Sequence, residues 1–494
     1  MQNYFLTKIG QEFPINTVTA NDQSYTSIAK IKNTNRLISV WNSYGADGSY
    51  WGIYGQLLDY KGNKIGNEFL INTYTASTQY MPCVTELNNG FMVFWSSYGQ
   101  DGSGYGVYYQ KYDQNAYKIS IEKQLNTFTS GDQGYVNLAY EISGRPRAVS
   151  TSDDKVIVTW VSNGQDGSAG GVYFSILDSN GNKIVQESLV NTYINDWQML
   201  PQIQVFSNNN FVISWASLNQ DGSGWGIFMQ RFDSSGNKIG IEMWVPSYVI
   251  GDQVVSSIAE LHGDRFVVVW DAYGEIGNGY EIKAQVFSKS GNKIGSDFFI
   301  NSYINSDQKI PVVKSFLNGN FFIAAWQSYS QDGSYYGIYG RVFDKEGDSV
   351  SSEFKINTFS YGDQAFCDIV IVDDSNYADI QLMITWHSPQ DGSGTGIFAQ
   401  SLSIDMSDFI SNDISRNLFS EVISSFNTTL HDLQNKLNNE KLNCVEVKEE
   451  LDVLKKEYNA SITALIEEYI SIEHTLETAS ISCIDNSNSD ISND

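Results

Sequence analysis

Hydrophobic and polar positions follow one repeating pattern over most of the chain. A mixed run such as YTSIAKI precedes a nearly continuous apolar run that ends in Trp, such as FMVFW or FVISW. A Gly- and Asp-rich turn then leads to a third run such as YGVYYQKYD, and a second turn leads to a last run of the type EF-x-INT. Runs of this length separated by turn residues predict four antiparallel strands in each copy of the pattern.

The pattern occurs seven times. The Trp residues that end the apolar run lie 54 to 65 residues apart and are Trp41, Trp95, Trp160, Trp215, Trp270, Trp326 and Trp386. The apolar run has no polar side, so its strand needs cover on both faces, and sheets stacked around an axis supply that cover. The repeat therefore predicts an all-β, seven-bladed β-propeller with four-stranded antiparallel blades.

The two ends of this region fit each other. The last copy stops after its third run, at residues 394–404, and the N-terminal stretch YFLTKIGQEFPINT matches the fourth run of the other copies. We therefore expect the N-terminal strand to complete the seventh blade and the propeller to span residues 1–404. Closure of this kind removes free sheet edges.

The turn between the second and third strands repeats as QDGSG. In an up-and-down blade this turn shares a face with the link between blades, while the GNK turns lie on the opposite face. Asp and Ser can bond their own backbone and Gly accepts positive φ, so turn formation explains the repeat. The alternative is a ring of cation or sugar sites. Such a ring would use Asp47, Asp101, Asp166, Asp221, Asp332 and Asp391. Calcium takes about six to eight oxygens, so the link Asp residues would have to contribute.

A single active site should break the sevenfold repetition, and few positions do so. The breaks are Glu275 and Ile276 in blade five, and Trp197 and Trp225 in blade four. Blades three and seven also carry insertions at 143–154 and 373–379, between the first and second strands. Exposed inserted loops commonly carry partner contacts, and the alternative interpretation is a tolerated variation in loop length.

No catalytic motif stands out. The four His residues form no metal-binding pattern, and the chain has no Walker A loop, GxSxG or Rossmann motif. Nothing singles out an acid and a base, although carboxylate pairs are available in an acidic protein. The prediction is a protein that is not an enzyme and has no cofactor, with Ca²⁺ as the one ion that the loops would suit.

The formal net charge of −27 disfavours nucleic acid and anionic membranes as partners. We find no apolar stretch of membrane-spanning length and no signal-peptide pattern in the sequence. The expected location is therefore the cytoplasm, a virion, or outside the cell by non-classical export.

The C-terminal segment has a different pattern, with apolar residues at alternating steps of three and four. This heptad seam predicts a helical coiled coil over residues 405–478, followed by a polar, disordered tail at 479–494. Its core would be Leu430, Leu433, Leu437, Val447, Leu451, Leu454, Tyr458, Ile462, Leu465, Tyr469 and Ile472. We expect the coiled coil to form a homo-oligomer. The alternative is an antiparallel hairpin that breaks at 437–443, or docking to another protein.

The blade phrase, W-x-S-x-x-QDGSG-x-GIY, resembles repeats of very large bacterial surface and secreted proteins that often also carry calcium-binding nonapeptide repeats. The resemblance covers residues 1–404 and implies a non-enzymatic, surface-associated role, although this chain lacks the nonapeptides. We therefore predict a structural or recognition protein whose propeller heads assemble through the coiled coil at a surface, fibre or virion. The alternatives are a carbohydrate-binding, lectin-like module and an enzyme with an unrecognised propeller site.

Overall fold

The computed structural model describes residues 6–135, 144–276, 279–407, 409 and 453. Within these residues the chain forms 28 strands and one short 3-10 helix, η1 (Pro389–Asp391). The predicted coiled coil with its core residues and the predicted tail lie outside the described residues, apart from a few single positions. None of the described helices is long and apolar enough to cross a membrane.

The strands form seven four-stranded sheets, one for each blade. Blades one to three contain β2 (Gln23–Ile31), β3 (Arg36–Tyr44), β4 (Trp51–Asp59), β5 (Lys64–Leu70), β6 (Gln79–Leu87), β7 (Gly90–Tyr98), β8 (Tyr105–Asp113), β9 (Lys123–Gln124), β10 (Arg147–Ser150), β11 (Val156–Asn163), β12 (Gly170–Leu177) and β13 (Lys183–Leu189). Blades four to six contain β14 (Gln198–Val205), β15 (Phe211–Leu218), β16 (Trp225–Phe232), β17 (Lys238–Trp244), β18 (Gln253–Leu261), β19 (Arg265–Tyr273), β20 (Tyr280–Ser288), β21 (Lys293–Phe299), β22 (Gln308–Phe316), β23 (Phe321–Tyr329), β24 (Tyr336–Asp344) and β25 (Phe354–Lys355). Blade seven contains β26 (Ala365–Asp373), β27 (Ile380–Ser388), β28 (Gly396–Ile404) and the N-terminal β1 (Leu6–Pro14).

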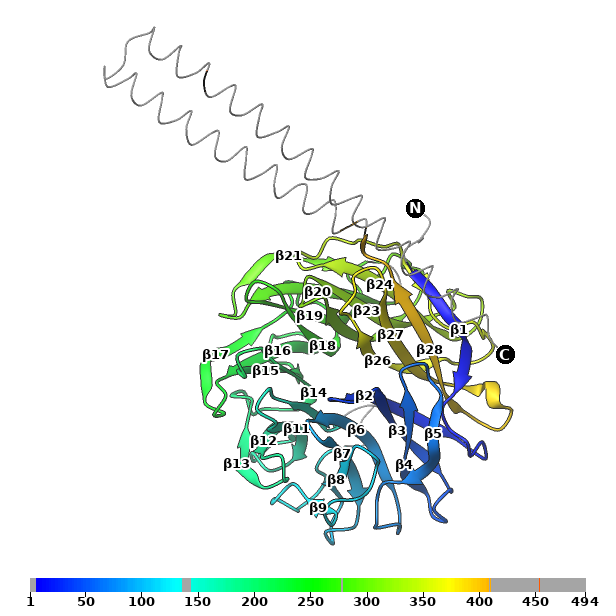
Figure 1. Cartoon of the computed structure of the whole chain (residues 1–494). Coiled ribbons are helices and arrows are strands. Elements are labelled where there is room, and N and C mark those ends of the chain that lie inside the picture. The colour runs from blue at the N-terminus through cyan, green and yellow to red at the C-terminus, as the bar shows by residue number, and fades with distance from the viewer. Residues whose placement is uncertain (1–5, 136–143, 277–278, 408, 410–452, 454–494) are drawn as a thin grey trace, which may run out of the picture. The chain divides into compact units, whose positions relative to one another are not determined.

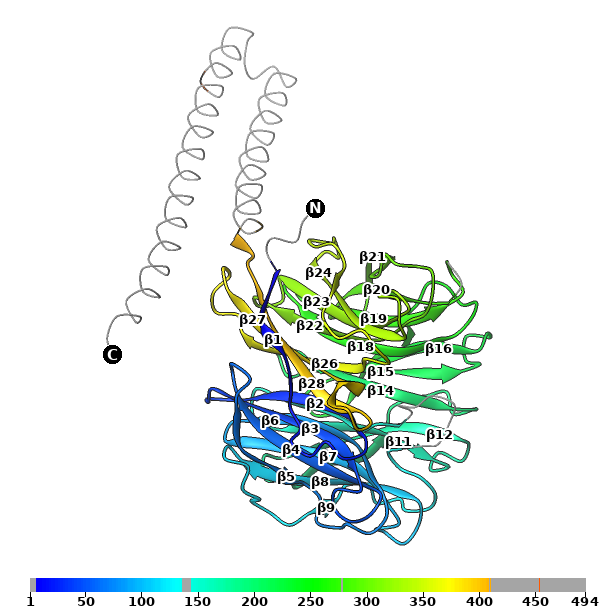
Figure 2. The same ribbon diagram turned by 90° about the vertical axis from the view of Figure 1, so that its right-hand side faces the viewer.

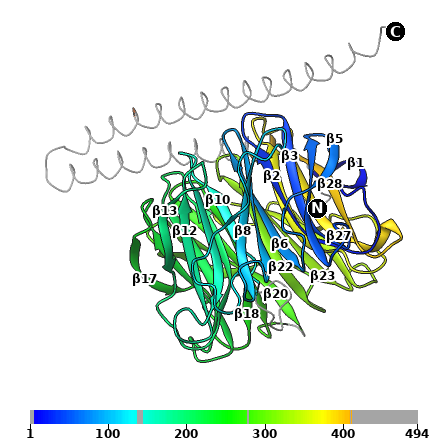
Figure 3. The same ribbon diagram turned by 90° about the horizontal axis from the view of Figure 1, so that it is seen from below.

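The predicted seven-bladed propeller and its closure are confirmed. Six blades take their strands in chain order, whereas blade seven has the order β1-β28-β27-β26. Figures 1, 2 and 3 all place β1 beside β28. The side-chain amide of Gln400 donates to the Ile9 carbonyl across this junction at 3.1 Å.

The hydrophobic core lies between neighbouring blades and is centred on their second strands. The seven Trp residues that end the apolar runs are each at most 1% exposed. In β15 every residue from Phe211 to Ala216 is buried, as the prediction of cover on both faces requires. Stacking of blades therefore satisfies the apolar runs that define the repeat.

Candidate functional site

The two faces of the propeller carry different turns, as predicted. On the link face, the backbone N–H of Tyr44, at the start of the blade-one QDGSG-type turn, donates to the carbonyl of Asp22 in the preceding link at 2.9 Å. On the opposite face, the Lys289 N–H in the GNK-type turn donates to the Asp264 carbonyl in the turn between strands one and two at 2.7 Å. We call the first the link face and the second the GNK face.

The six loop Asp residues lie in six different blades, and the structure does not bring them together into one site. Each holds its own turn, because its Oδ1 accepts the N–H of the residue two positions later. Examples are Ser49 N to Asp47 at 3.0 Å and Ser223 N to Asp221 at 3.0 Å. The link Asp residues are also used locally, as when Tyr105 N donates to Asp132 at 3.0 Å. Turn formation thus accounts for one oxygen of each loop Asp.

Blade junctions use the Asn and Gln of the links. In the link between blades one and two, Asn72 Nδ2 donates to Gln79 Oε1 at 3.1 Å, and Asn72 Oδ1 accepts the Ile53 N–H at 2.7 Å. A further repeated group, the acidic residue of the EF run, escaped the sequence analysis. Glu122 Oε2 accepts the N–H of Thr73 at 2.6 Å and its hydroxyl at 2.9 Å, which joins blade two to the end of blade one. The invariant place of this Glu in the repeat was the signal that could have revealed it.

In blade five, the residue that breaks the repeat forms an ion pair with a lysine of the same blade. Glu275 pairs with the buried Lys283, whose Nζ lies 2.6 Å from Glu275 and 3.2 Å from Asp297. Ile276, which replaces the loop Asp, is 39% exposed. The sequence analysis noted Glu275 and Ile276 but missed Lys283, which stands where other blades have an aromatic residue. The cluster is a closed ion-pair network and not an open site.

The two extra Trp residues of blade four are packing residues. Trp197, in the link, lies against Gly170 of blade three. Trp225 begins β16, and its backbone N–H donates to Asp252 at 3.1 Å. Both rings are partly buried against the core cluster that includes Met199 and Val254. They therefore broaden the contact between blades on the link face.

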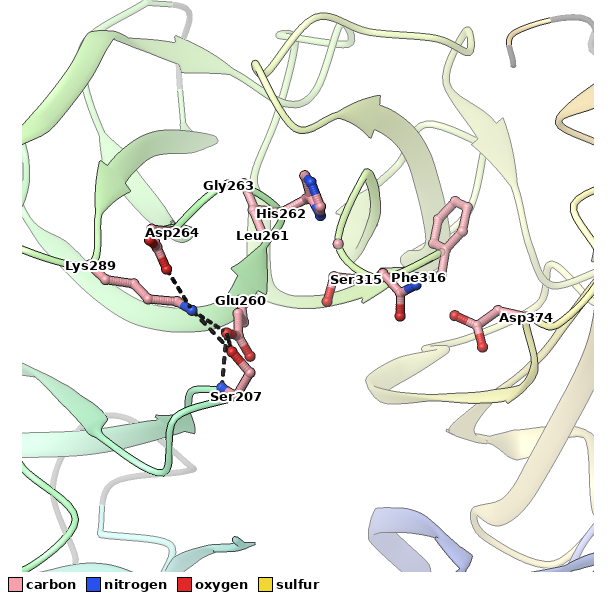
Figure 4. A pocket seen from close by; sticks show the side chains of 12 residues that line it. Ser207, Glu260, Leu261, His262, Gly263, Asp264, Lys289, Ser315, Phe316 and Asp374 are labelled. Atoms are coloured by element: carbon pink, nitrogen blue, oxygen red, sulfur yellow. Dashed lines mark hydrogen bonds and ion pairs between the residues drawn. The ribbon is translucent and has the colours of Figure 1, made fainter. Parts of the chain in front are cut away.

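A pocket of about 460 Å³ opens among the turns of blades four to seven on the GNK face. It is lined by Ser207, Glu260, Leu261, His262, Gly263, Asp264, Lys289, Ser315, Phe316, Asn318, Gly319 and Asp374. Figure 4 shows Glu260 and Asp374 on different blades, with Ser315 and Phe316 between them. The volume falls within the usual range for small-molecule sites.

Two of the three carboxylates that line the pocket, those of Glu260 and Asp374, are each held by one oxygen. Glu260 Oε1 accepts the N–H and hydroxyl of Ser207 at 2.9 and 2.8 Å, and Lys289 Nζ lies 2.6 Å from the same oxygen. Asp374 Oδ2 accepts the Leu317 N–H at 2.7 Å. These bonds fix the orientation of both side chains and leave Glu260 Oε2 and Asp374 Oδ1 for other contacts. The arrangement can exchange protons with a bound molecule.

The sequence analysis did not find this pocket, although it pointed to one part of it. Asp374 belongs to the insertion at 373–379, for which partner contacts were one of two interpretations. The other insertion, at 143–154, contributes nothing to the pocket. Its Arg145 is buried and donates to the carbonyl of Pro82 at 3.0 Å, and burial lowers the pKa of its guanidinium to about 10.

Comparisons with known proteins show no family for this chain. No family model and no curated protein matches the chain. Similar solved structures include a protein of unknown function from Dyadobacter fermentans, with 9% identity over 81% of this chain and 100% of that one, and a TM-score of 0.47. The GH93 α-L-arabinofuranosidase of Fusarium graminearum, in complex with arabinobiose, has 12% identity, coverages of 81% and 99%, and a TM-score of 0.41. The α-L-arabinanase of Penicillium chrysogenum, also with arabinobiose, has 11% identity, coverages of 79% and 98%, and a TM-score of 0.43.

These neighbours correct the prediction of a non-catalytic structural or recognition protein. Several of them are glycoside hydrolases. The lack of a catalytic sequence motif in a propeller is therefore no evidence against an enzyme. The physical reason is that blades far apart in the sequence meet around one axis, and residues of a shared site then form no local motif. At 9–12% identity and TM-scores of 0.41 to 0.47 the likeness does not assign a reaction to this chain.

Proposed function

We propose that the propeller is a hydrolase that acts on an uncharged sugar or oligosaccharide in the GNK-face pocket, with Glu260 and Asp374 as its acid–base pair. The observation that carries this proposal is the placement of two oriented carboxylates, from blade five and from the blade-seven insertion, in one pocket. Hydrolysis of a glycosidic bond requires such a pair, one to protonate the leaving oxygen and one to activate water or attack carbon.

The neighbours of the two carboxylates suggest their roles. The ammonium group of Lys289 lies 2.6 Å from Glu260 and forms an ion pair with it. We therefore assign Glu260 the role that needs a charged group. No ion pair to Asp374 occurs among the described residues, and we assign Asp374 the proton donor's role.

The lining of the pocket favours a neutral ligand rich in hydroxyl groups. Carboxylate, amide and hydroxyl groups of Asp264, Asn318 and Ser315 can bond sugar hydroxyls, and Phe316 supplies an apolar surface. Three carboxylates and an overall charge of −27 disfavour phosphorylated or otherwise anionic molecules. Hydrogen-bond groups around a small apolar patch are typical of carbohydrate sites.

The test is release of reducing sugar from a panel of neutral oligosaccharides and nitrophenyl glycosides, including arabinobiose. We expect turnover of at least one substrate. Glu260→Gln and Asp374→Asn should each lower kcat/KM by about 10²-fold or more, because each removes a proton-transfer group.

The matched control is Glu86→Gln. Glu86 occupies the place of Glu260 in blade two, at the end of β6, and it also pairs with a lysine, Lys32, at 3.4 Å. This variant should retain full activity. Absence of turnover with every substrate, or an active Glu260→Gln variant, would overturn the proposal.

A further inference from the structure

Three buried oxygens recur without a donor in the link-face turns of blades three and four. They are Ser162 Oγ, Gln165 Oε1 and Asp166 Oδ2 in blade three, and Ser217 Oγ, Gln220 Oε1 and Asp221 Oδ2 in blade four. No hydrogen-bond partner for any of the six atoms is present in the described part of the chain. Both Ser residues are completely buried. Buried polar atoms without partners are costly, so these positions call for a ligand.

The Ser and Asp oxygens of each turn face the same small space. Ser162 lies directly opposite Gly171 across β11 and β12, and a Cβ on Gly171 would be 2.7 Å from Asp166 Oδ2. The hydroxyl and the carboxylate are therefore on the same side of the sheet and at the same level. Gln165 is anchored by its other end, because its Nε2 donates to Glu187 at 3.1 Å.

Blade six shows what satisfies the same arrangement. Lys355 Nζ lies 2.7 Å from Asp332 Oδ2, and the Ser328 hydroxyl donates to Gln331 Oε1 at 2.7 Å. Lys355 is on the fourth strand opposite Tyr339, and the equivalent residue of blade three is Leu189, opposite Tyr173.

The other blades extend this pattern. In blade four the residue equivalent to Lys355 is Trp244, which like Leu189 brings no charge to the turn. Blade five, which has no loop Asp, again places an ammonium group in its cluster, that of Lys283. Where a blade carries a lysine in this cluster, its ammonium group lies beside the oxygens. Where the equivalent residue is Leu or Trp, the oxygens remain without partners.

We infer that the turns of blades three and four each bind one calcium ion, through the Ser hydroxyl, the Gln carbonyl oxygen and the Asp carboxylate, with water completing the shell. Only oxygen ligands are available, which suits a hard cation. Among the described residues no three His, Cys, Asp or Glu side chains are placed so that they could hold a metal ion together, so each of these would be a site of low charge with one carboxylate. Their Kd should then be about 10⁻⁴ to 10⁻³ M.

The remaining blades are expected to bind no ion. In blade one Ala46 replaces the Gln, and in blade two Gln124 Nε2 donates to Asp101 Oδ2 at 3.3 Å. Blade seven has a turn that is one residue shorter, with Pro389 before the Gln. The inference concerns the link face and does not depend on the hydrolase proposed for the GNK face.

The test is thermal unfolding of the full chain in EDTA and in about 5 mM CaCl2, several times the expected Kd, at constant ionic strength. Calcium should raise the Tm. In Leu189→Lys, which copies the lysine of blade six, we expect a Tm in EDTA at least equal to that of the wild type and about half of the calcium-induced rise. Leu189→Lys combined with Asp221→Asn should abolish the rise.

Two further variants keep the test decisive. If Leu189→Lys fails to fold, Asp166→Asn should show the same halving. Asp178→Asn, a change in the opposite turn of blade three, should keep the full rise, because Asp178 Oδ1 caps its own turn by accepting Asn180 N and Asn182 N. An unchanged Tm of the wild type in calcium would mean that the sites hold water only. That result, or a rise unaffected by these substitutions, would overturn the inference.

Discussion

At the scale of single residues, blade five replaces a glycine with a fully buried acid. Glu281 stands where the other six blades have Gly, and its Oε2 accepts the Asn301 side-chain amide at 2.6 Å. Burial raises the pKa of Glu281 to about 7. The acid fills the space over the third strand that a loop Asp occupies elsewhere, while Ile276 takes the Asp position in the turn. The exchange is readable as YEIKAQ in blade five where blade one has WGIYGQ, but only the structure shows why both changes occur together.

This carboxyl group predicts a pH-dependent stability. The pKa in the folded state is above the ordinary value of 4.5, so the folded protein holds its proton more tightly than the unfolded chain. Stability should therefore fall as pH rises from about 4.5 to 7 and then level off, with a loss on the order of 3 kcal/mol. Glu281→Gln keeps an acceptor for Asn301 and should remove this part of the slope. Urea unfolding at several pH values measures it.

The control for this measurement is Glu346→Gln, since the Glu346 side chain is 48% exposed. That variant should keep the slope of the wild type. Equal slopes in wild type and Glu281→Gln would show that Glu281 does not titrate in this range.

At the scale of elements, each fourth strand holds the preceding blade through its acidic residue. The same contact recurs at the ring closure, where Glu12 of β1 accepts the N–H groups of Thr358 and Phe359 at 2.8 and 3.0 Å. Strand number, blade number and closure could be predicted because they follow from a local repeat. The pocket could not, because Ser207, Glu260 and Asp374 lie far apart in the sequence and only the packing of blades four to seven brings them together.

We expect Glu12→Ala and Glu122→Ala to destabilise the propeller by similar amounts, about 2 kcal/mol each, since both remove charged acceptors from backbone N–H groups. Urea unfolding provides the comparison. Ile121→Ala is the control, because Ile121 is adjacent to Glu122 and 80% exposed, and it should change little. A loss confined to Glu122→Ala would mean that the closing blade is not held in the same way as the others.

At the scale of the whole propeller, closure depends on one strand from the far end of the chain. Removal of residues 1–14 should expose the edge of β28, lower the Tm and increase the solution mass by edge-to-edge pairing. Removal of residues 1–5 alone leaves β1 complete and should change neither quantity. Light scattering and thermal unfolding of both variants check this expectation. A monomeric variant without residues 1–14 and with an unchanged Tm would contradict it.

The place of β1 also has a consequence during synthesis on the ribosome. Ile9 and its partner Gln400 are 391 residues apart, so at about 5–20 residues per second the first strand waits roughly 20–80 s for the strand it must join. An apolar strand exposed for so long would invite aggregation. In β1, however, no residue is fully buried even in the finished blade, in contrast to the continuous buried run of β15. The strand that is made first and placed last is therefore one that water can solvate while the other blades form.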